Sequence, residues 1–237
     1  MIMPKDAGTR TKPIYVRQLF ALEHMLSEHN GFFAPQAQHC LHDLERTEHP
    51  VFFGNAMFVR KSIPVISFRS GMAYGKFDHL NGDRPAARSM QGAVVQKSGT
   101  TFVVAHFHGI WTGGGKHDAP ERIEQSNNVL DLLADLRHEG QKSTGQDPRM
   151  ILGGDFNLES KTQALDLLEM GRGPGEHLIN LNRRRRLLDT RTSRYPSTKK
   201  SREADYVLVS QNTQVLDFQV VKDPEVSDHA PLILDCA

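Results

Sequence analysis

The chain has 237 residues, 38% of them hydrophobic, and its 29 basic and 28 acidic side chains leave a net charge of +1. We expect one globular domain over 1–237, because this composition argues against disorder and no apolar run approaches the roughly 18 residues that span a bilayer. The polar N-terminus predicts no signal peptide, and a content of only two cysteines (Cys40 and Cys236) favours a cytoplasmic protein. Because the net charge is near zero, the molecule has no overall positive field that would attract an anionic polymer.

The first half of the chain is predicted to contain one helix followed by strands. Residues 1–13 are polar and irregular, and a helix is predicted over 13–29 because Pro13 suits a first helical turn. Its expected apolar stripe consists of Tyr15, Leu19, Leu22 and Leu26, and Asn30-Gly31 is the expected stop. Strands are predicted at 51–59, 64–68, 93–97 and 100–107, the last two joined by a tight turn at Ser98-Gly99.

The second half mixes helices and strands. A glycine-rich loop over 109–119 precedes a helix that begins near Pro120 and is expected to bury Val129, Leu132, Leu133 and Leu136. After a buried strand at 150–152, Ser160 and Gln163 predict a capping box for a helix that Gly171 ends. Strands are predicted at 205–209, 215–221 and 232–234. This order favours packed mixed sheets covered by helices over a purely parallel doubly wound sheet.

Polar residues gather where four of these strands begin or end. They are His106 and His108, Asp155 and Asn157, Asp205, and Asp228 with His229. Functional groups collect at the strand ends of open sheets. Carboxylates, an amide and imidazoles together suit metal-assisted phosphoester hydrolysis, because a hard cation takes oxygen ligands while His stabilises charge on phosphoryl oxygens.

Each of these features has a simpler interpretation. The Asp-x-Asn pattern is also typical of a helix-capping turn, Asp-His of an ordinary turn, and a strand His of a core group. The basic runs at 183–186 and 199–202 are either solvated loop charge or a phosphate-facing rim. Trp111 either stacks on a nucleobase or packs its own loop.

The conjunction of these motifs resembles the endonuclease/exonuclease/phosphatase superfamily, from about Phe53 to the C-terminus. The resemblance rests on Gly-Asn55-Ala-Met-Phe-Val-Arg60, the strand before His108, Gly-Asp155-Phe-Asn157, Asp205-Tyr206 and Ser-Asp228-His229-Ala-Pro-Leu232. The Gly-Asp-Phe-Asn and Ser-Asp-His-x-Pro-Leu motifs, in this order and about seventy residues apart, are its most specific part.

The resemblance implies an α/β fold, a four-layer α-β-β-α sandwich of two mixed sheets, and a set of roles. Asp155 would activate water with help from Asn157, Asp205 would orient His229 against the phosphate, and His108 would be the second phosphate-binding imidazole. Asp228 and Asn157 would lie beside Mg²⁺, or Mn²⁺. The candidate substrate-binding residues are Asn55, Arg88, His106 and Trp111. Arg88 reads equally as a surface charge.

The family's first two strands, which end in Asn and in the Gln-Glu pair that supplies the principal metal ligand, have no counterpart in the sequence. We therefore expect a sandwich lacking its first strand or two, from a misassigned start or a truncated gene. The leading hypothesis is a metal-dependent phosphodiesterase, nuclease or phosphatase. The alternative is a catalytically impaired member that binds a phosphate-bearing ligand or partner, and a third is an unstable gene product. DNA, a nucleotide, a phosphoinositide and a phospholipid head group all remain open as substrates.

Overall fold

The computed structural model describes residues 18–38, 51–78, 80–81, 84–85, 87–111, 115–173, 175–198 and 201–237. The expectations for 1–17, Cys40, the middle of the glycine-rich loop at 112–114, and 199–200 lie outside these residues. The helices are α1 (Gln18–Met25), α2 (Pro120–Thr144), α3 (Gln163–Met170) and α4 (Leu181–Arg185). The strands are β1 (His29–Gln38), β2 (Phe52–Arg60), β3 (Val65–Tyr74), β4 (Leu80–Asn81), β5 (Arg84–Pro85), β6 (Arg88–Lys97), β7 (Thr100–Phe107), β8 (Arg149–Asp155), β9 (Leu178–Asn180), β10 (Asp205–Ser210), β11 (Val215–Val220) and β12 (Leu232–Cys236).

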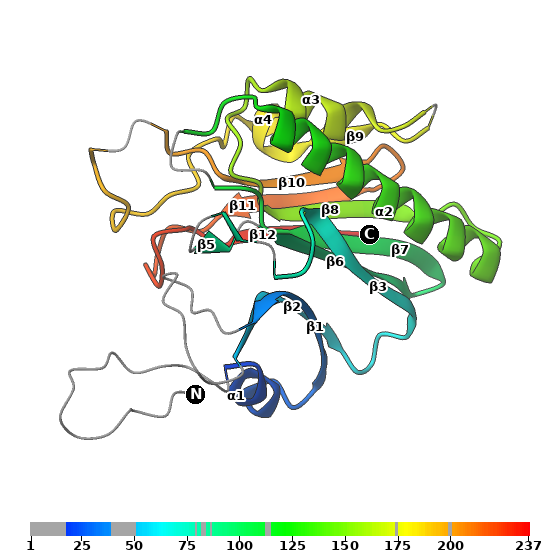
Figure 1. The fold of residues 1–237 in the computed structure, drawn as a ribbon. Coiled ribbons are helices and arrows are strands. Elements are labelled where there is room, and N and C mark those ends of the chain that lie inside the picture. The colour runs from blue at the N-terminus through cyan, green and yellow to red at the C-terminus, as the bar shows by residue number, and fades with distance from the viewer. Residues whose placement is uncertain are drawn as a thin grey trace.

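A six-stranded mixed sheet in the order β3-β6-β7-β8-β10-β9 forms the centre of the molecule (Figure 1). Successive residues of its strands face opposite sides, so each strand supplies two cores. On β7, Val103 faces the core shared with α2 and α3, while Phe102 faces the core shared with the β1–β2 hairpin. The β11–β12 hairpin packs over β10 through Phe218.

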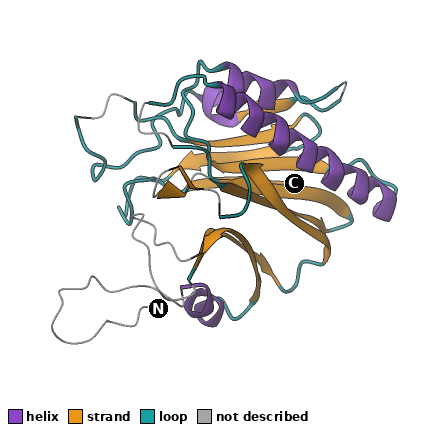
Figure 2. Cartoon of the chain, viewed as in Figure 1, coloured by secondary structure: helices purple, strands orange, loops and turns teal. Residues whose placement is uncertain are grey.

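The layers therefore run from α2 and α3, through the central sheet, to the two hairpins, with α1 next to β1 on the outside (Figure 2). This is the predicted sandwich of mixed sheets. Among the described residues, the second layer consists of the antiparallel pairs β1–β2 and β11–β12. No helix of the described residues is both long and apolar enough to cross a membrane.

The parallel pair β7–β8 fixes the position of the polar residues. Parallel neighbours need a crossover, and α2 supplies it. The N-terminus of α2 begins at Pro120 as predicted, but the preceding Ala119 makes no side-chain cap. The Asp118 carboxylate instead accepts hydrogen bonds from the backbone N–H groups of Gln163 and Ala164, at 2.8 and 2.9 Å, and so binds the first turn of α3.

Several sequence predictions are corrected. The helix predicted to reach residue 29 ends at Met25, and His29–Gln38 is a strand with a bulge between Pro35 and Ala37. Leu22, expected on a buried stripe, is exposed. Thr162, not Ser160, caps α3, because its side chain accepts from the N–H of Leu165. Strand β9 and helix α4 were not predicted.

Candidate active site

Strand register brings the candidate carboxylates together. Asp155 ends β8 and Asp205 begins β10, and in this antiparallel pair they are direct partners. His108 follows the end of β7, which runs parallel to β8, so it reaches the same edge of the sheet. The His108 Nε2 lies 3.7 Å from Asp155 Oδ2. That distance exceeds a direct hydrogen bond.

His229 is held in place by Asp205, as predicted. Its Nδ1 lies 3.0 and 2.9 Å from the two Asp205 carboxylate oxygens. Thr190, fully buried, donates its hydroxyl to the same carboxylate at 2.8 Å. The outer nitrogen of His229, Nε2, lies 3.7 Å from Asp155 Oδ2. Two imidazole nitrogens therefore face one carboxylate oxygen at the same distance.

The loop after β8 is shaped by Asp155 and Asn157. The Asp155 Oδ1 accepts a hydrogen bond from the Asn157 N–H at 2.9 Å, and Asn157 has a φ of 51°. Asn tolerates this left-handed conformation better than most residues. The Asn157 amide also donates to the carbonyl of Gly109 at 3.2 Å. Since α3 begins only at Gln163, this is an Asx turn and not a helix cap.

Burial and charge set the protonation of the cluster. Burial, followed by the nearby Asp205 charge, raises the pKa of Asp155 to about 6. Burial lowers the pKa of His229, but the hydrogen bond and charge of Asp205 outweigh it, and the net shift is upward. Burial and a neighbouring negative charge are expected to act on the two groups in this way.

Two buried cations border the cluster and were missed from the sequence. Arg191, 4% exposed, donates from its NH1 to Asp228 Oδ2 at 3.1 Å and contacts His229 Nε2. Lys116, 6% exposed, donates to the backbone carbonyl of Glu203. Burial and the charge of Arg191 lower the pKa of Lys116. No motif marks either residue, because each lies in a loop and only the fold brings it to His229 or Asp205.

The predicted substrate-binding residues do not all reach this cluster. Arg88 is buried and donates to the carbonyl of Gly109 at 3.0 Å, so it is not a surface charge. Asn55 donates to the carbonyl of Ser89 at 2.8 Å. The Gln91 amide donates to His106 Nε2 at 2.8 Å, and burial lowers the pKa of His106 to about 4. Trp111 is 51% exposed.

Two of the four arginines at 183–186 are paired with acidic side chains. Arg183 lies 2.7 Å from both Asp166 and Glu169, and Arg185 lies 3.3 Å from Asp217. These pairs hold α4 against neighbouring elements. Both earlier interpretations therefore fail for Arg183 and Arg185, because these residues are neither free to bind phosphate at a rim nor wholly solvated.

The sequence model of the Endonuclease/Exonuclease/phosphatase family matches residues 15–229. The chain belongs to this family. No curated protein sequence matches it. Among solved structures, it is similar to a mannosyl-6-phosphatase of Bacteroides thetaiotaomicron, with 17% identity and a TM-score of 0.63 over 94% of this chain and 82% of that one.

Two further family structures show the same fold. The human Nocturnin catalytic domain with bound sulfate is 18% identical, with a TM-score of 0.62 over 94% of this chain and 77% of that one. TDP2 of D. rerio, complexed with a single-strand DNA product, is 13% identical, with a TM-score of 0.59 over 91% of this chain and 80% of that one. The endonuclease/exonuclease/phosphatase fold is thus shared with a phosphatase and with a protein that binds DNA.

The donors of this family member fit a divalent cation. Among the described residues, Asp155, Asp205 and His229 each offer one ligand atom, and these atoms lie within 4.8 Å of one another. Burial, and after it the charge of Asp205, raises the pKa of Asp155, and a cation beside the two carboxylates would counter both effects. Asp228 lies beside this group, 3.9 Å from His229 Nε2, but its carboxylate is already paired with Arg191.

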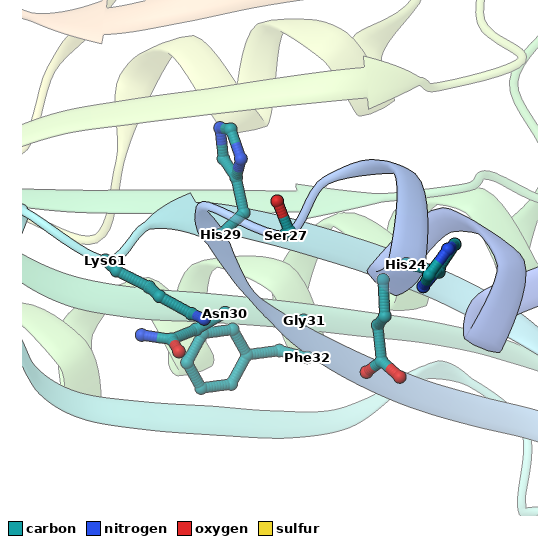
Figure 3. A pocket seen from close by; sticks show the side chains of 8 residues that line it. His24, Ser27, His29, Asn30, Gly31, Phe32 and Lys61 are labelled. Carbon is teal, nitrogen blue, oxygen red and sulfur yellow. The ribbon is translucent and has the colours of Figure 1, made fainter.

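A separate cavity of 610 Å³ lies where α1 meets β1 (Figure 3). Glu23, His24, Ser27, His29 and Lys61 are among the residues that line it. None of the lining residues belongs to the cluster at the ends of β7, β8 and β10. The candidate site of this family member therefore lies apart from this cavity.

Proposed function

We propose that the chain is a divalent-metal-dependent phosphoester hydrolase, a phosphodiesterase, nuclease or phosphatase, in which water attacks phosphorus in line. One observation carries the proposal: two carboxylates and two imidazoles converge at one edge of the central sheet, with His108 and His229 Nε2 both 3.7 Å from Asp155 Oδ2. Family membership and the phosphatase and DNA-bound neighbours support the same reaction class.

Each residue has a role that its contacts can support. Asp155 orients the attacking water and takes its proton as the oxygen–phosphorus bond forms, which suits a carboxyl whose pKa is raised toward neutrality. Asn157 fixes the turn that aims this carboxylate. His229, held by Asp205, faces the phosphoryl oxygens together with His108 and stabilises their developing charge. The leaving oxygen departs from the opposite side of phosphorus.

Mg²⁺ or Mn²⁺ would be held by the ligand atoms of Asp155, Asp205 and His229 that lie within 4.8 Å of one another, with the predicted ligands Asp228 and Asn157 beside them. When bound, the ion would supply Lewis-acid polarisation of the phosphoryl group and lower the pKa of a nearby water. We further propose that residues 1–237 act as a single domain in the cytoplasm. The substrate class extends from DNA and nucleotides to phosphoinositides and phospholipid head groups.

A panel of these phosphoesters tests the function, with Mg²⁺, Mn²⁺ or a chelator present. Asp155→Asn keeps the size of the side chain but removes the base, so we expect kcat to fall by about 10² or more on whichever substrate turns over. Asp235→Asn, in strand β12, is the matched control and is expected to retain activity. Hydrolysis that survives both chelation and Asp155→Asn would contradict the mechanism.

A second function has one observation in its favour. Asp228 is paired with Arg191 at 3.1 Å, and the Asn157 amide is tied to Gly109. If these contacts persist when metal is present, the chain binds a phosphate-bearing ligand or partner without turning it over. Phosphoester binding measured by calorimetry, with no product released at high Mg²⁺, would establish this alternative.

A further inference from the structure

The position of Arg191 is fixed by backbone hydrogen bonds between its own loop and the loop that carries His229. Arg191 and His229 form an isolated antiparallel bridge, outside the named strands. On either side of it, the Ala230 N–H donates to the Thr190 carbonyl at 2.9 Å and the Thr192 N–H donates to the Asp228 carbonyl at 3.1 Å. The backbone of Arg191 is therefore set by the same contacts that place His229.

The guanidinium of Arg191 has unused hydrogen-bonding capacity. Its NH1 meets Asp228 and His229 Nε2, and its Cζ lies 4.4 Å from the centre of the Tyr195 ring. Its Nε is buried and has no hydrogen-bond partner among the described residues. A guanidinium carries five donors and no acceptor, and a buried charge is costly unless it is well paired. Asp228, 47% exposed, is a weak counter-charge for it.

The neighbouring groups extend this donor surface. Lys116 lies close enough for the charge of Arg191 to lower its pKa, so two cations are buried on one side of the cluster. His108 and His229 are partly exposed at the rim. Arg191 NH1 lies next to His229 Nε2, so when that nitrogen carries a proton both groups are donors whose hydrogen bonds the oxygens of one ligand can accept. A tetrahedral oxyanion offers several such oxygens.

We propose that Arg191 is a phosphate-binding residue of this site, and that it binds a phosphate group together with His229 without needing a divalent cation. This inference deepens the proposed function and rests on it for the identity of the ligand. The phosphate oxygens that Arg191 binds are the non-bridging ones, which lie around the axis that joins the attacking water, phosphorus and the leaving oxygen. Binding of the phosphate group then does not require the metal.

Inorganic phosphate is the probe, titrated into the full chain in excess chelator and followed by calorimetry and by the ¹⁵N signals of the His229 imidazole. We expect saturable binding and a shift of the His229 signals. Arg191→Gln should weaken binding by about tenfold or more, and Arg191→Lys should restore part of it, because the charge returns without the planar fork. Arg194→Gln, exposed in the same loop, is the matched control and should bind within about twofold of wild type.

Thermal melts establish that the variants are folded, and Arg191→Lys serves as the test if Arg191→Gln is not. The inference is wrong if wild type binds no phosphate in chelator, if the His229 signals do not move, or if the Arg191 variants bind as wild type does. A chain that binds phosphate through Arg191 but hydrolyses nothing would keep this inference and refute the proposed function. A chain that hydrolyses phosphoesters while its phosphate affinity is independent of Arg191 would refute this inference and keep the proposed function.

Discussion

At the scale of single residues, His106 illustrates how a fold can give a predicted site residue a different task. It lies on β7 in register with Gln91 of β6, whose amide donates to its Nε2. This hydrogen bond needs an unprotonated ring nitrogen. Burial lowers the pKa of His106 to about 4, well below the ordinary value of His. The residue is therefore better suited to holding the two strands together than to binding phosphate.

This shift makes stability depend on pH. The unfolded chain binds a proton at His106 more tightly than the folded chain does. The contribution of neutral His106 to the free energy of unfolding is therefore complete above about pH 6.5 and is lost as the pH falls toward about 4. From about pH 7 to about pH 5 the loss should be about 2 kcal/mol. Urea unfolding of His106→Gln should show a shallower fall than wild type. His138→Gln, exposed on α2, should follow wild type, and equal slopes in all three proteins would contradict the assignment.

At the scale of elements, the close approach of β7 and β8 depends on one glycine. Gly154 has a φ of 141°, and a Cβ there would lie 2.2 Å from the carbonyl oxygen of Phe107. A side chain is excluded twice, by backbone conformation and by space. The adjacent Gly153 has an ordinary φ, and its Cβ would lie 3.7 Å from the nearest atom. Of these two adjacent glycines, Gly154 is the one that the approach of Asp155 to His108 requires.

These two glycines form a matched pair for experiment. Gly154→Ala should lower the free energy of unfolding by about 2 kcal/mol or more and reduce activity, because the end of β8 must move. Gly153→Ala should change stability by less than about 1 kcal/mol. Urea denaturation measures both. A Gly154→Ala protein as stable and active as Gly153→Ala would show that β8 tolerates the displacement.

At the scale of the whole molecule, several basic side chains of the described residues are paired with acidic ones. Arg183 and Arg185 meet acids on α3 and β11, while Arg137 of α2 lies 2.7 Å from Asp147. With a net charge of +1, little field remains to attract a polyanion. The buried cations Arg191 and Lys116 lie beside the cluster of Asp155, Asp205 and His229, a placement that suits recognition of a single phosphate group.

The effect of salt on substrate binding tests how many phosphate groups the charges of the protein contact. If the chain recognises one phosphate group, raising salt from about 50 to about 200 mM should weaken substrate binding by less than about tenfold, whereas a protein with 6–10 phosphate contacts loses about 10³–10⁵. The Michaelis constant for the best substrate, measured across this range, gives the answer. A steep slope would show a DNA-binding face that the net charge conceals.

Much of the fold follows from local pattern, and the failures have local causes. Strand β7 has the predicted bounds, because its apolar run ends at the predicted Ser98-Gly99 turn on one side and at polar residues on the other. Strand β1 was missed because Gly31 and Pro35 are typical of a helix stop and of a loop. In the structure Gly31 pairs with Phe58, and Pro35 borders a bulge, where a strand tolerates proline.

The sequence by itself determined the family, the mixed α/β class and the polar motifs at the strand ends, because each of these is recognised from short patterns of residues that are neighbours along the chain. Tertiary structure decided which polar groups meet. Strand register pairs Asp155 with Asp205, and a bridge between two loops brings Arg191 to His229. His106 is hydrogen-bonded to Gln91 and does not join the cluster. Such contacts join residues 15 or more positions apart, and their energy depends on burial, which a local sequence pattern does not show.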